Sequence, residues 1–280
     1  MKQLVLVGYP LGHSLSPVMH NAALNEMGLD SSYRYDIQPT RAHELQTCVQ
    51  SIREGSLEGA NVTTPYKTDI MNYLEEVSEE ATAVGSVNTL YRSEDRVAGC
   101  NTDVSGFLES LKEYGVSLKG RHATILGAGG AARAIGYALV NDEVAGLNVL
   151  NRSLARAEEL VRNLNTQGTC DVHVGPTNTA EFDFNETDLL VNCTPIGMVG
   201  HSVTETPLGS KNLHSDMVVV DLVYNPRRTK LLQEAERVGC LIIDGIGMLV
   251  HQGAEALELW VGKKPPIEVM RSAVIQALGG

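Results

Sequence analysis

The stretch HATILGAGGAARAIGYALV (residues 122–140) decides the fold. Its apolar run at 122–126 predicts a buried strand, a glycine-rich turn follows at once, and the remainder predicts a helix. Gly127 and Gly129 allow a tight turn and let backbone N–H groups approach a pyrophosphate, while the small Ala132 lets the helix pack closely on the strand. The apolar run at 147–151 predicts the next strand. This order favours a dinucleotide-binding unit, and the alternative is an ordinary tight turn between a strand and a helix.

The residues after the second of these strands favour one dinucleotide over the other. An NAD site usually carries an Asp or Glu there, which accepts hydrogen bonds from the ribose 2′-OH. This chain has Asn151-Arg152-Ser153 instead, and Arg156 follows. In the first turn of a helix, Arg156 can converge with Arg152 on a 2′-phosphate, and Ser153 or Asn151 can add neutral hydrogen bonds. The pattern therefore favours NADP, and the alternative is the solvated start of an amphipathic helix.

The rest of the chain alternates strand and helix signals, which is typical of an α/β protein with mostly parallel sheets. Ser16 as N-cap and Pro17 as the first helical residue predict a helix that ends at Gly28. Thr64-Pro65 likewise predicts a helix that carries Lys67 in its first turn. Further strands are expected at 4–8, 33–37, 57–63, 188–194 and 217–224, with a strand pair inside 81–103. Further helices are expected at 41–53, at 104–114 and, with a break at 262–266, at 247–280.

The composition is ordinary for a soluble globular protein, with 43% hydrophobic and 20% charged residues among 280. Its 22 basic and 34 acidic side chains give a net charge of −12, which argues against a general affinity for nucleic acid or anionic membranes but does not exclude an anionic substrate. No apolar run has the length of a transmembrane helix, and no signal peptide is recognisable. The five scattered cysteines form no CxxC pair, so we expect a cytoplasmic protein without a disulfide framework or a metal site.

Polar clusters lie where the predicted strands end, which is where open α/β sheets bind ligands. Ser14 and Ser16 offer two hydroxyls beside the N–H groups of a helix start, which suits a carboxylate, although Ser16 can simply be a helix cap. Asn61 and Thr63 share one face of their strand, and Lys67 follows them. A lysine in a first helical turn opposes the helix dipole, and this favours a function over an ordinary surface position.

A third cluster comprises Asn88 and the segment Asn101-Thr102-Asp103, although Asp103 can also cap the helix that follows it. Together the three clusters supply hydroxyls, amides, an ammonium and a carboxylate. This set of groups is suited to a polyhydroxylated acid.

These motifs closely resemble those of the shikimate dehydrogenase family, in order and over nearly the whole chain. They are SLSP at 14–17, NVTTPYK at 61–67, GSVNTL at 85–90, GCNTD at 99–103, GAGGAAR at 127–133, NRS at 151–153, NCTPIGM at 192–198 and DGIGMLVHQGA at 244–254. The resemblance implies an NADPH-dependent, reversible reduction of 3-dehydroshikimate to shikimate, in the pathway to chorismate and aromatic amino acids. It also implies a substrate-binding domain at 1–103, completed by helices at 247–280, and a Rossmann-type NADP domain at 104–246.

The resemblance further assigns roles to individual residues. It implies that Lys67 and Asp103 form the catalytic pair. The implied substrate-binding residues are Ser14, Ser16, Asn61, Thr63, Lys67, Asn88, Asp103, Tyr224 and Gln252. The implied cofactor-binding residues are Gly127, Ala128, Gly129, Gly130, Ala131, Asn151, Arg152, Ser153, Arg156, Thr194, Leu222 and Gly245.

Several alternatives stay open at this point. A quinate/shikimate dehydrogenase with relaxed substrate and cofactor choice is the nearest, and a non-catalytic ligand-sensing module on the same fold is another. The intact Lys67 and Asp103 weigh against the sensing module. An ammonium at Lys67 can stabilise a growing alkoxide and deliver a proton, with Asp103 orienting it, but which of the two is the formal acid or base is left open. A monomer and a homodimer are both compatible with the sequence.

Overall fold

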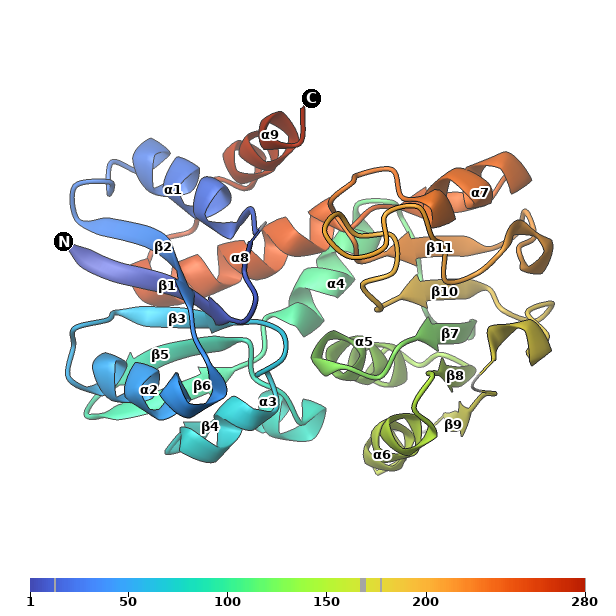
Figure 1. Cartoon of the computed structure of the whole chain (residues 1–280), viewed down its shortest axis with the longest axis horizontal. Coiled ribbons are helices and arrows are strands. Elements are labelled where there is room, and N and C mark those ends of the chain that lie inside the picture. Colours follow the sequence, from blue (N-terminus) through green and yellow to red (C-terminus); the bar gives the residue numbers. More distant parts are fainter. Residues whose placement is uncertain (13, 167–169, 177, 280) are drawn as a thin grey trace. The chain divides into compact units, whose positions relative to one another are not determined.

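The computed structural model describes residues 1–12, 14–166, 170–176 and 178–279 and divides the chain into two compact units (Figure 1). The first unit comprises Met1–Gly106 together with Val250–Gly280, and the second comprises Phe107–Leu249. The end of the chain therefore returns to the first unit. Within the described ranges, no helix combines the length and the apolar character needed to cross a membrane.

The first unit is built on a six-stranded sheet in the order β2-β1-β3-β5-β6-β4. Its strands are β1 (Lys2–Gly8), β2 (Tyr33–Pro39), β3 (Gly59–Val62), β4 (Glu76–Val77), β5 (Thr89–Ser93) and β6 (Arg96–Cys100). β1 pairs in parallel with β2 and β3, whereas β5 runs antiparallel to both β3 and β6. The carboxyl ends of β1, β3 and β6 and the start of β5 therefore lie at the same end of the sheet.

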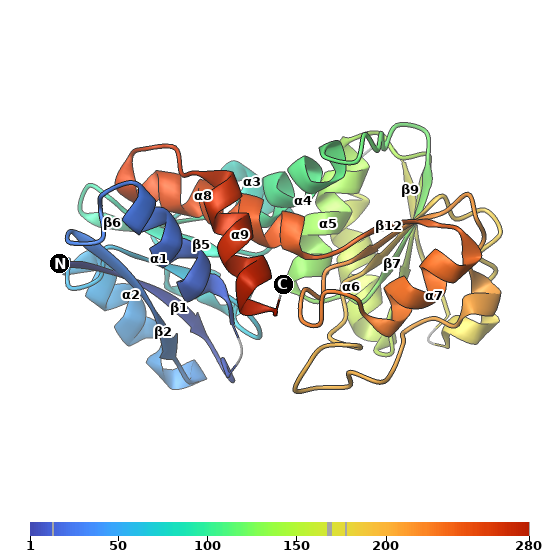
Figure 2. The same ribbon diagram turned by 90° about the horizontal axis from the view of Figure 1, so that it is seen from above.

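Helices cover both faces of this sheet (Figure 2). On one face, α2 (Leu45–Arg53) buries an apolar stripe against β1, β3 and β5. On the other face, α1 (Ser16–Glu26) packs on β2 and on α9 (Ile267–Ala277). Trp260 of α8 (Ile246–Val261) donates from Nε1 to Leu90 O of β5 at 2.9 Å. Shorter helical segments are α3 (Glu79–Val84) and the 3-10 helices Ala42–Glu44 and Asp69–Tyr73.

Two of the predicted helix starts are wrong. The N-cap position of α1 is Leu15 and not Ser16, because α1 already begins at Ser16, whose backbone N–H donates to Ser14 Oγ at 3.3 Å. The Thr64–Pro65 peptide bond is cis, and turns followed by the 3-10 helix replace the expected α-helix. Tyr66 is buried in the core beneath α2, and this packing holds the segment against the sheet. Lys67 therefore lies in a turn and not in the first turn of an α-helix.

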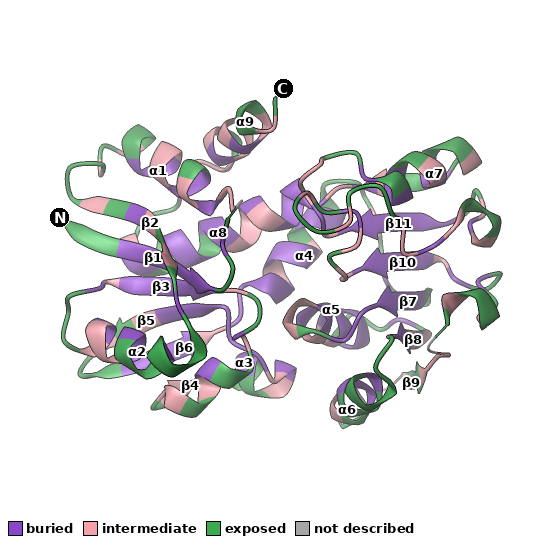
Figure 3. Ribbon diagram, viewed as in Figure 1, coloured by how far each residue is buried: buried purple, intermediate pink, exposed green. Residues whose placement is uncertain are grey.

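The second unit is an entirely parallel six-stranded sheet in the order β12-β11-β10-β7-β8-β9. Its strands are β7 (His122–Leu126), β8 (Gly146–Leu150), β9 (Asp171–Val174), β10 (Leu189–Asn192), β11 (Val218–Asp221) and β12 (Leu241–Ile243). Every residue of β10 and β11 is buried, which explains their continuous apolar sequences (Figure 3). The strand order reverses between β7 and β10, and ligands bind at such switch points in open α/β sheets.

Helices connect these parallel strands in the manner expected for a doubly wound sheet. α5 (Gly130–Asn141) packs on β7 and β8, α6 (Leu154–Leu164) packs on β8 and β9, and α7 (Lys230–Val238) packs on β11 and β12. The remaining helical segments are α4 (Asp103–Lys112), which begins in the first unit, and the 3-10 helices Thr179–Glu181 and Ser210–Asn212. The predicted α/β class with a Rossmann-type unit is confirmed.

Candidate active site

Lys67 and Asp103 form a buried ion pair at the end of the first sheet. Lys67 Nζ lies 2.5 Å from Asp103 Oδ2, and the side chains are 14% and 4% exposed, respectively. Lys67 follows β3, and Asp103 follows β6 as the first residue of α4. A charge pair so well shielded from water needs further hydrogen bonds to offset its desolvation.

Asn88, which directly precedes β5, supplies such hydrogen bonds. Its Nδ2 faces three acceptors: Asp103 Oδ1 at 3.0 Å, Thr102 Oγ1 at 2.9 Å and Gln252 Oε1 at 3.3 Å. Its Oδ1 accepts from the backbone N–H of Thr102 at 2.8 Å. Gln252 comes from α8, so the far end of the chain contributes to the same cluster. The structure thus brings together four of the residues that the sequence predicted, with Lys67 as the only cation among them.

Asn61 is held inside the unit by hydrogen bonds to its neighbours. The residue is 5% exposed, and its Nδ2 donates to Thr89 Oγ1 at 3.1 Å and to Asn88 O at 3.2 Å. Its Oδ1 accepts from Tyr35 OH at 2.8 Å. Thr63, two residues further along the chain, is half-buried. Asn61 therefore stabilises the positions of Asn88 and Thr89 beside the Lys67–Asp103 pair.

The two serines lie at the start of α1. Ser14 Oγ donates to Ser16 Oγ at 3.2 Å, and Ser16 is 7% exposed. Because Ser16 is not the N-cap residue, its hydroxyl is not used to cap the helix. The pair presents two adjacent hydroxyls at a helix N-terminus, which is a suitable environment for a carboxylate.

Sequence reasoning missed Thr89 and Tyr35, which support this cluster, whereas it included Asn101 among the polar residues at the strand ends. Thr89 Oγ1 donates to Asn88 Oδ1 at 3.0 Å, and Asn101 Oδ1 accepts from the backbone N–H of Asp103 at 3.0 Å. Tyr35 holds Asn61 from β2, the edge strand of the sheet. The motif GSVNTL included Thr89 without a role, whereas Tyr35 had no signal that distinguished it from a core aromatic residue.

The glycine-rich turn of the second unit follows β7 at the switch point. Gly127 has a φ of +112°, and a Cβ there would lie 3.3 Å from Cys193 C and from Thr194 Cγ2 after β10. Gly129 is the N-cap residue of α5, and a Cβ there would have no neighbour within 4 Å. Ala132 is fully buried. The turn thus needs glycine at position 127 and leads into a helix N-terminus that has no side-chain cap. Backbone N–H groups at such a helix start can bind a pyrophosphate.

The end of β8 carries the residues predicted to select NADP. Asn151 Nδ2 donates to Ser153 O at 2.9 Å, and Ser153 is the N-cap residue of α6. Arg152 and Arg156 are exposed, and neither has a carboxylate partner in the described part of the chain. Arg133, by contrast, is paired with a glutamate of α6. The donor set is basic and lacks an acid, so it fits a ribose 2′-phosphate.

Three further residues of the predicted cofactor set lie at neighbouring strand ends of the second unit. Thr194 donates from Oγ1 to Asn192 Oδ1 at 2.7 Å. Gly245 approaches Leu222 so closely that a Cβ at Gly245 would lie 2.4 Å from Leu222 O. Tyr224, which the sequence assigned to the substrate, follows β11 in this second unit and is half-buried. Its part in substrate binding stays a prediction.

The buried carboxylate of Asp221 connects these strand ends through hydrogen bonds. Asp221 is fully buried, accepts from Asn192 Nδ2 at 2.9 Å and Val223 N at 3.1 Å, and also accepts from Thr229 Oγ1 at 2.6 Å. Burial raises the pKa of Asp221 to about 6, against the lowering effect of these hydrogen bonds. Sequence reasoning did not single out Asp221, because it stands within a continuous apolar strand.

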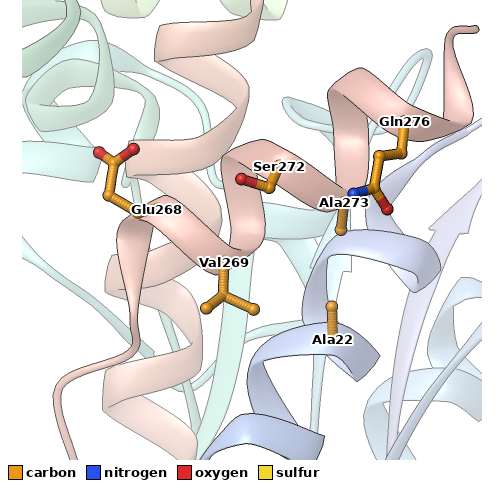
Figure 4. A pocket seen from close by; sticks show the side chains of 6 residues that line it. All are labelled: Ala22, Glu268, Val269, Ser272, Ala273 and Gln276. Carbon is orange, nitrogen blue, oxygen red and sulfur yellow. The ribbon is translucent and has the colours of Figure 1, made fainter. Parts of the chain in front are cut away.

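No three His, Cys, Asp or Glu side chains among residues 1–12, 14–166, 170–176 and 178–279 are grouped so that they could hold a metal ion. A pocket between α1 and α9 is lined by small and apolar side chains together with Glu268 and Gln276, and Ala22 faces Ala273 across it (Figure 4). It contains none of the predicted site residues.

A parallel sheet with a glycine-rich turn at its switch point, joined to a second α/β unit that holds a lysine–carboxylate pair, defines a dehydrogenase that uses a nicotinamide dinucleotide. Three family models match the chain in order. They describe a shikimate dehydrogenase substrate binding domain (residues 6–90), a shikimate / quinate 5-dehydrogenase (109–246) and a shikimate 5′-dehydrogenase C-terminal domain (245–275). The chain belongs to the shikimate dehydrogenase family, as its motifs predicted.

Individual relatives agree with this assignment. A shikimate dehydrogenase (NADP(+)) of Symbiobacterium thermophilum is 43% identical over 99% of this chain and 95% of its own length. A crystal structure of the shikimate 5-dehydrogenase from Thermus thermophilus in complex with NADP(H) and shikimate is 37% identical, covers 99% of this chain and 100% of that one, and has a TM-score of 0.87. A quinate dehydrogenase from Corynebacterium glutamicum in complex with NAD is also similar, at 33% identity, 98% and 99% coverage and a TM-score of 0.88.

Proposed function

We propose that the protein catalyses the NADP-dependent, reversible reduction of 3-dehydroshikimate to shikimate. The observation that carries this proposal is the buried pair of Lys67 and Asp103, tied to Asn88 and Gln252 at the end of the first sheet. Membership of the shikimate dehydrogenase family supports the same reaction.

The first unit provides most of the substrate-binding residues in this proposal. Ser14 and Ser16 donate hydrogen bonds to the ring carboxylate from the start of α1. The ring hydroxyls bind Thr63, Asn88, Asp103 and Gln252, whose side chains combine hydroxyl, amide and carboxylate groups. Asn61 supports them, and Tyr224 adds a further hydroxyl for the carboxylate. A site with paired donors and acceptors rejects analogues that lack a hydroxyl, because its buried polar groups are then left without partners.

The second unit holds NADP. The backbone at Gly127, Ala128, Gly129, Gly130 and Ala131 receives the pyrophosphate, and Thr194, Leu222 and Gly245 flank the dinucleotide at the neighbouring strand ends. The 2′-phosphate binds the set at the end of β8, namely Asn151, Arg152, Ser153 and Arg156. When bound as NADPH, the cofactor supplies the hydride that reduces the ketone.

Lys67 is the residue that acts on the ketone oxygen. Its ammonium stabilises the negative charge that grows on the oxygen during reduction, and it delivers the proton that completes the hydroxyl group. Asp103 orients the Lys67 ammonium through the 2.5 Å contact, and Asn88 fixes the second carboxylate oxygen of Asp103 at 3.0 Å. In the direction of oxidation, the same pair accepts the proton.

The alternative activities have less support. One structural relative is a quinate dehydrogenase in complex with NAD, but this chain carries Arg152 and no acid directly after β8. A ligand-sensing module does not need the buried Lys67–Asp103 pair. We further propose that the enzyme works in the cytoplasm, as a monomer or a homodimer. A measurement of its molecular mass in solution distinguishes the two oligomeric states.

Initial rates with each pair of substrate and cofactor test the proposal. The full chain should reduce 3-dehydroshikimate with NADPH at a much higher kcat/KM than with NADH, and should oxidise shikimate in preference to quinate. Turnover of quinate with NAD as the best pair contradicts the proposal in favour of the relaxed dehydrogenase. Binding of shikimate without turnover favours the sensing module.

A further inference from the structure

Tyr35 carries a buried hydroxyl group that contacts Asn61 but has no assigned part in substrate binding. The residue lies in the middle of β2 and is fully buried. Its OH donates to Asn61 Oδ1 at 2.8 Å. The side chain of Asn21 in α1 bonds both backbone groups of Tyr35: it accepts from Tyr35 N at 3.0 Å and donates to Tyr35 O at 2.7 Å. The phenol is therefore fixed in position relative to α1.

The ring of Tyr35 is also held in place, by contacts with two neighbouring aromatic rings. The His20 imidazole stacks on it with ring centroids 4.1 Å apart and an interplanar angle of 12°, and Trp260 lies at 6.2 Å. His20 is one helical turn after Ser16, so the two residues lie on the same face of α1. Burial lowers the pKa of His20 to about 3, so the ring that stacks on Tyr35 is neutral at physiological pH.

The Ser16 side chain also affects the pKa of the Tyr35 phenol. Burial raises the pKa of Tyr35, and a hydrogen bond from the Ser16 side chain acts in the opposite direction. Ser16 in turn accepts from Ser14 Oγ at 3.2 Å. On its other side, Asn61 donates to Thr89 Oγ1 at 3.1 Å. Hydrogen bonds thus run from Tyr35 through Asn61 to Asn88 and Thr89 beside Asp103, while Asn21 and the stacked His20 hold Tyr35 against α1, the helix that carries Ser16.

We propose that Tyr35 is a positioning residue that keeps Ser16 and Asn61 at a fixed separation. The carboxylate-binding serines and the Asn88–Asp103 cluster can then bind the same substrate molecule at the same time. This inference rests on the proposed function. A hydroxyl with a fixed rotamer binds a carboxylate without a further loss of conformational freedom, and coupled hydrogen bonds in a buried environment reinforce one another.

Tyr35→Phe tests this role, because phenylalanine keeps the stacking on His20 and removes only the hydroxyl. We expect the KM for shikimate to rise roughly 3- to 10-fold, the effect of losing one net hydrogen bond, while kcat and the KM for NADP change by less than about 2-fold. Tyr33→Phe is the matched control on the same strand. Its hydroxyl contacts only Lys2, at 3.5 Å, among the described residues, so its KM for shikimate should equal that of the wild type.

A double-mutant cycle with Ser16→Ala separates positioning from mere packing. If Tyr35 acts through Ser16, the increase in KM caused by Ser16→Ala is smaller in the Tyr35→Phe background than in the wild type. An unchanged KM in Tyr35→Phe, whatever its melting temperature, overturns the positioning role, and so do independent effects of the two substitutions. A wild-type protein that neither binds nor oxidises shikimate overturns the proposed function as well, whereas wild-type turnover with an unchanged Tyr35→Phe overturns the role of Tyr35 alone.

Discussion

The Lys67 ammonium is the group whose removal should affect the reaction most. Lys67→Met keeps an unbranched chain of similar length and removes the charge and the proton donor. The ammonium meets a neutral ketone in the ground state but a growing alkoxide in the transition state, so its interaction strengthens along the reaction. We expect kcat to fall by at least ~100-fold, the lower end for a positioned acid–base group, with KM changed only a few-fold.

The same substitution should also destabilise the first unit. The Asp103 side chain is 4% exposed and loses the partner that lies 2.5 Å away, so a buried charge is left unpaired. Breaking a buried ion pair in this way typically costs ~3–5 kcal/mol, and we expect about 3 kcal/mol because Asn88 still donates to the carboxylate. Lys67→Met combined with Asp103→Asn removes both charges, and most of the stability should return without the activity.

Steady-state kinetics in both directions, together with urea unfolding of the two variants, check this prediction. The reasoning is refuted if Lys67→Met turns over at a near wild-type rate, or if only its KM rises, since Lys67 would then be a binding residue. It is equally refuted if the double variant regains activity together with stability.

The remaining predictions concern binding and stability. Arg152→Leu with Arg156→Leu should raise the KM for NADPH by at least ~10-fold and leave kcat nearly intact, because charged hydrogen bonds to the 2′-phosphate are lost equally from ground and transition states. Ser14→Ala and Ser16→Ala should each raise the KM for shikimate roughly 3- to 10-fold, and Ser16→Ala should not incur the stability loss of a removed helix cap, because the N-cap residue of α1 is Leu15. Burial raises the pKa of Asp221 to about 6, above its unfolded value of ~3.9, so the folded protein binds more protons between these values and stability falls as the pH rises from about 4 to about 6, by up to ~3 kcal/mol. Asp221→Asn should abolish that slope.

Each of these predictions has an outcome that contradicts it. An unchanged KM for NADPH in the arginine variant shows that the basic end of β8 is only a solvated helix start. Serine variants that lose stability with an unaltered KM show that the hydroxyls are structural. For Asp221, the exposed Asp216→Asn is the control, and it should keep the wild-type dependence of unfolding free energy on pH. If the Asp221 and Asp216 variants show the same dependence, the buried carboxylate does not titrate as expected.

The sequence was sufficient to predict the parts of the fold that follow from local pattern. The strand at 122–126, its glycine-rich turn and the helix after it occur as β7, the turn and α5, because periodicity and glycine placement act over a few residues. The convergence of Asn88, Asp103 and Lys67 was also predictable, since each stands where a strand begins or ends. The helix predicted to start at Thr64-Pro65 is absent from this described part of the chain, because a Thr-Pro pair is found in turns as well as at helix starts. Here the packing of Tyr66 in the core favours the turn.

The supporting residues could not be predicted for a different reason. Tyr35 reaches Asn61 across 26 positions of sequence, and the contact depends on the pairing of β1 with both β2 and β3. Asp221 resembles a chance polar residue in an apolar strand, although it joins Asn192, Val223 and Thr229. Such contacts depend on strand order, which a single sequence does not reveal.

The fate of the hydride tests the central claim most directly. The purified chain is supplied with 3-dehydroshikimate and with NADPH deuterated at the transferable position of the nicotinamide, and the product is analysed by mass spectrometry and NMR. The account predicts shikimate with deuterium on the carbon that was the ketone, and predicts that Lys67→Met forms the same labelled product far more slowly. Unlabelled shikimate, or no shikimate from a folded chain that binds both ligands, contradicts it.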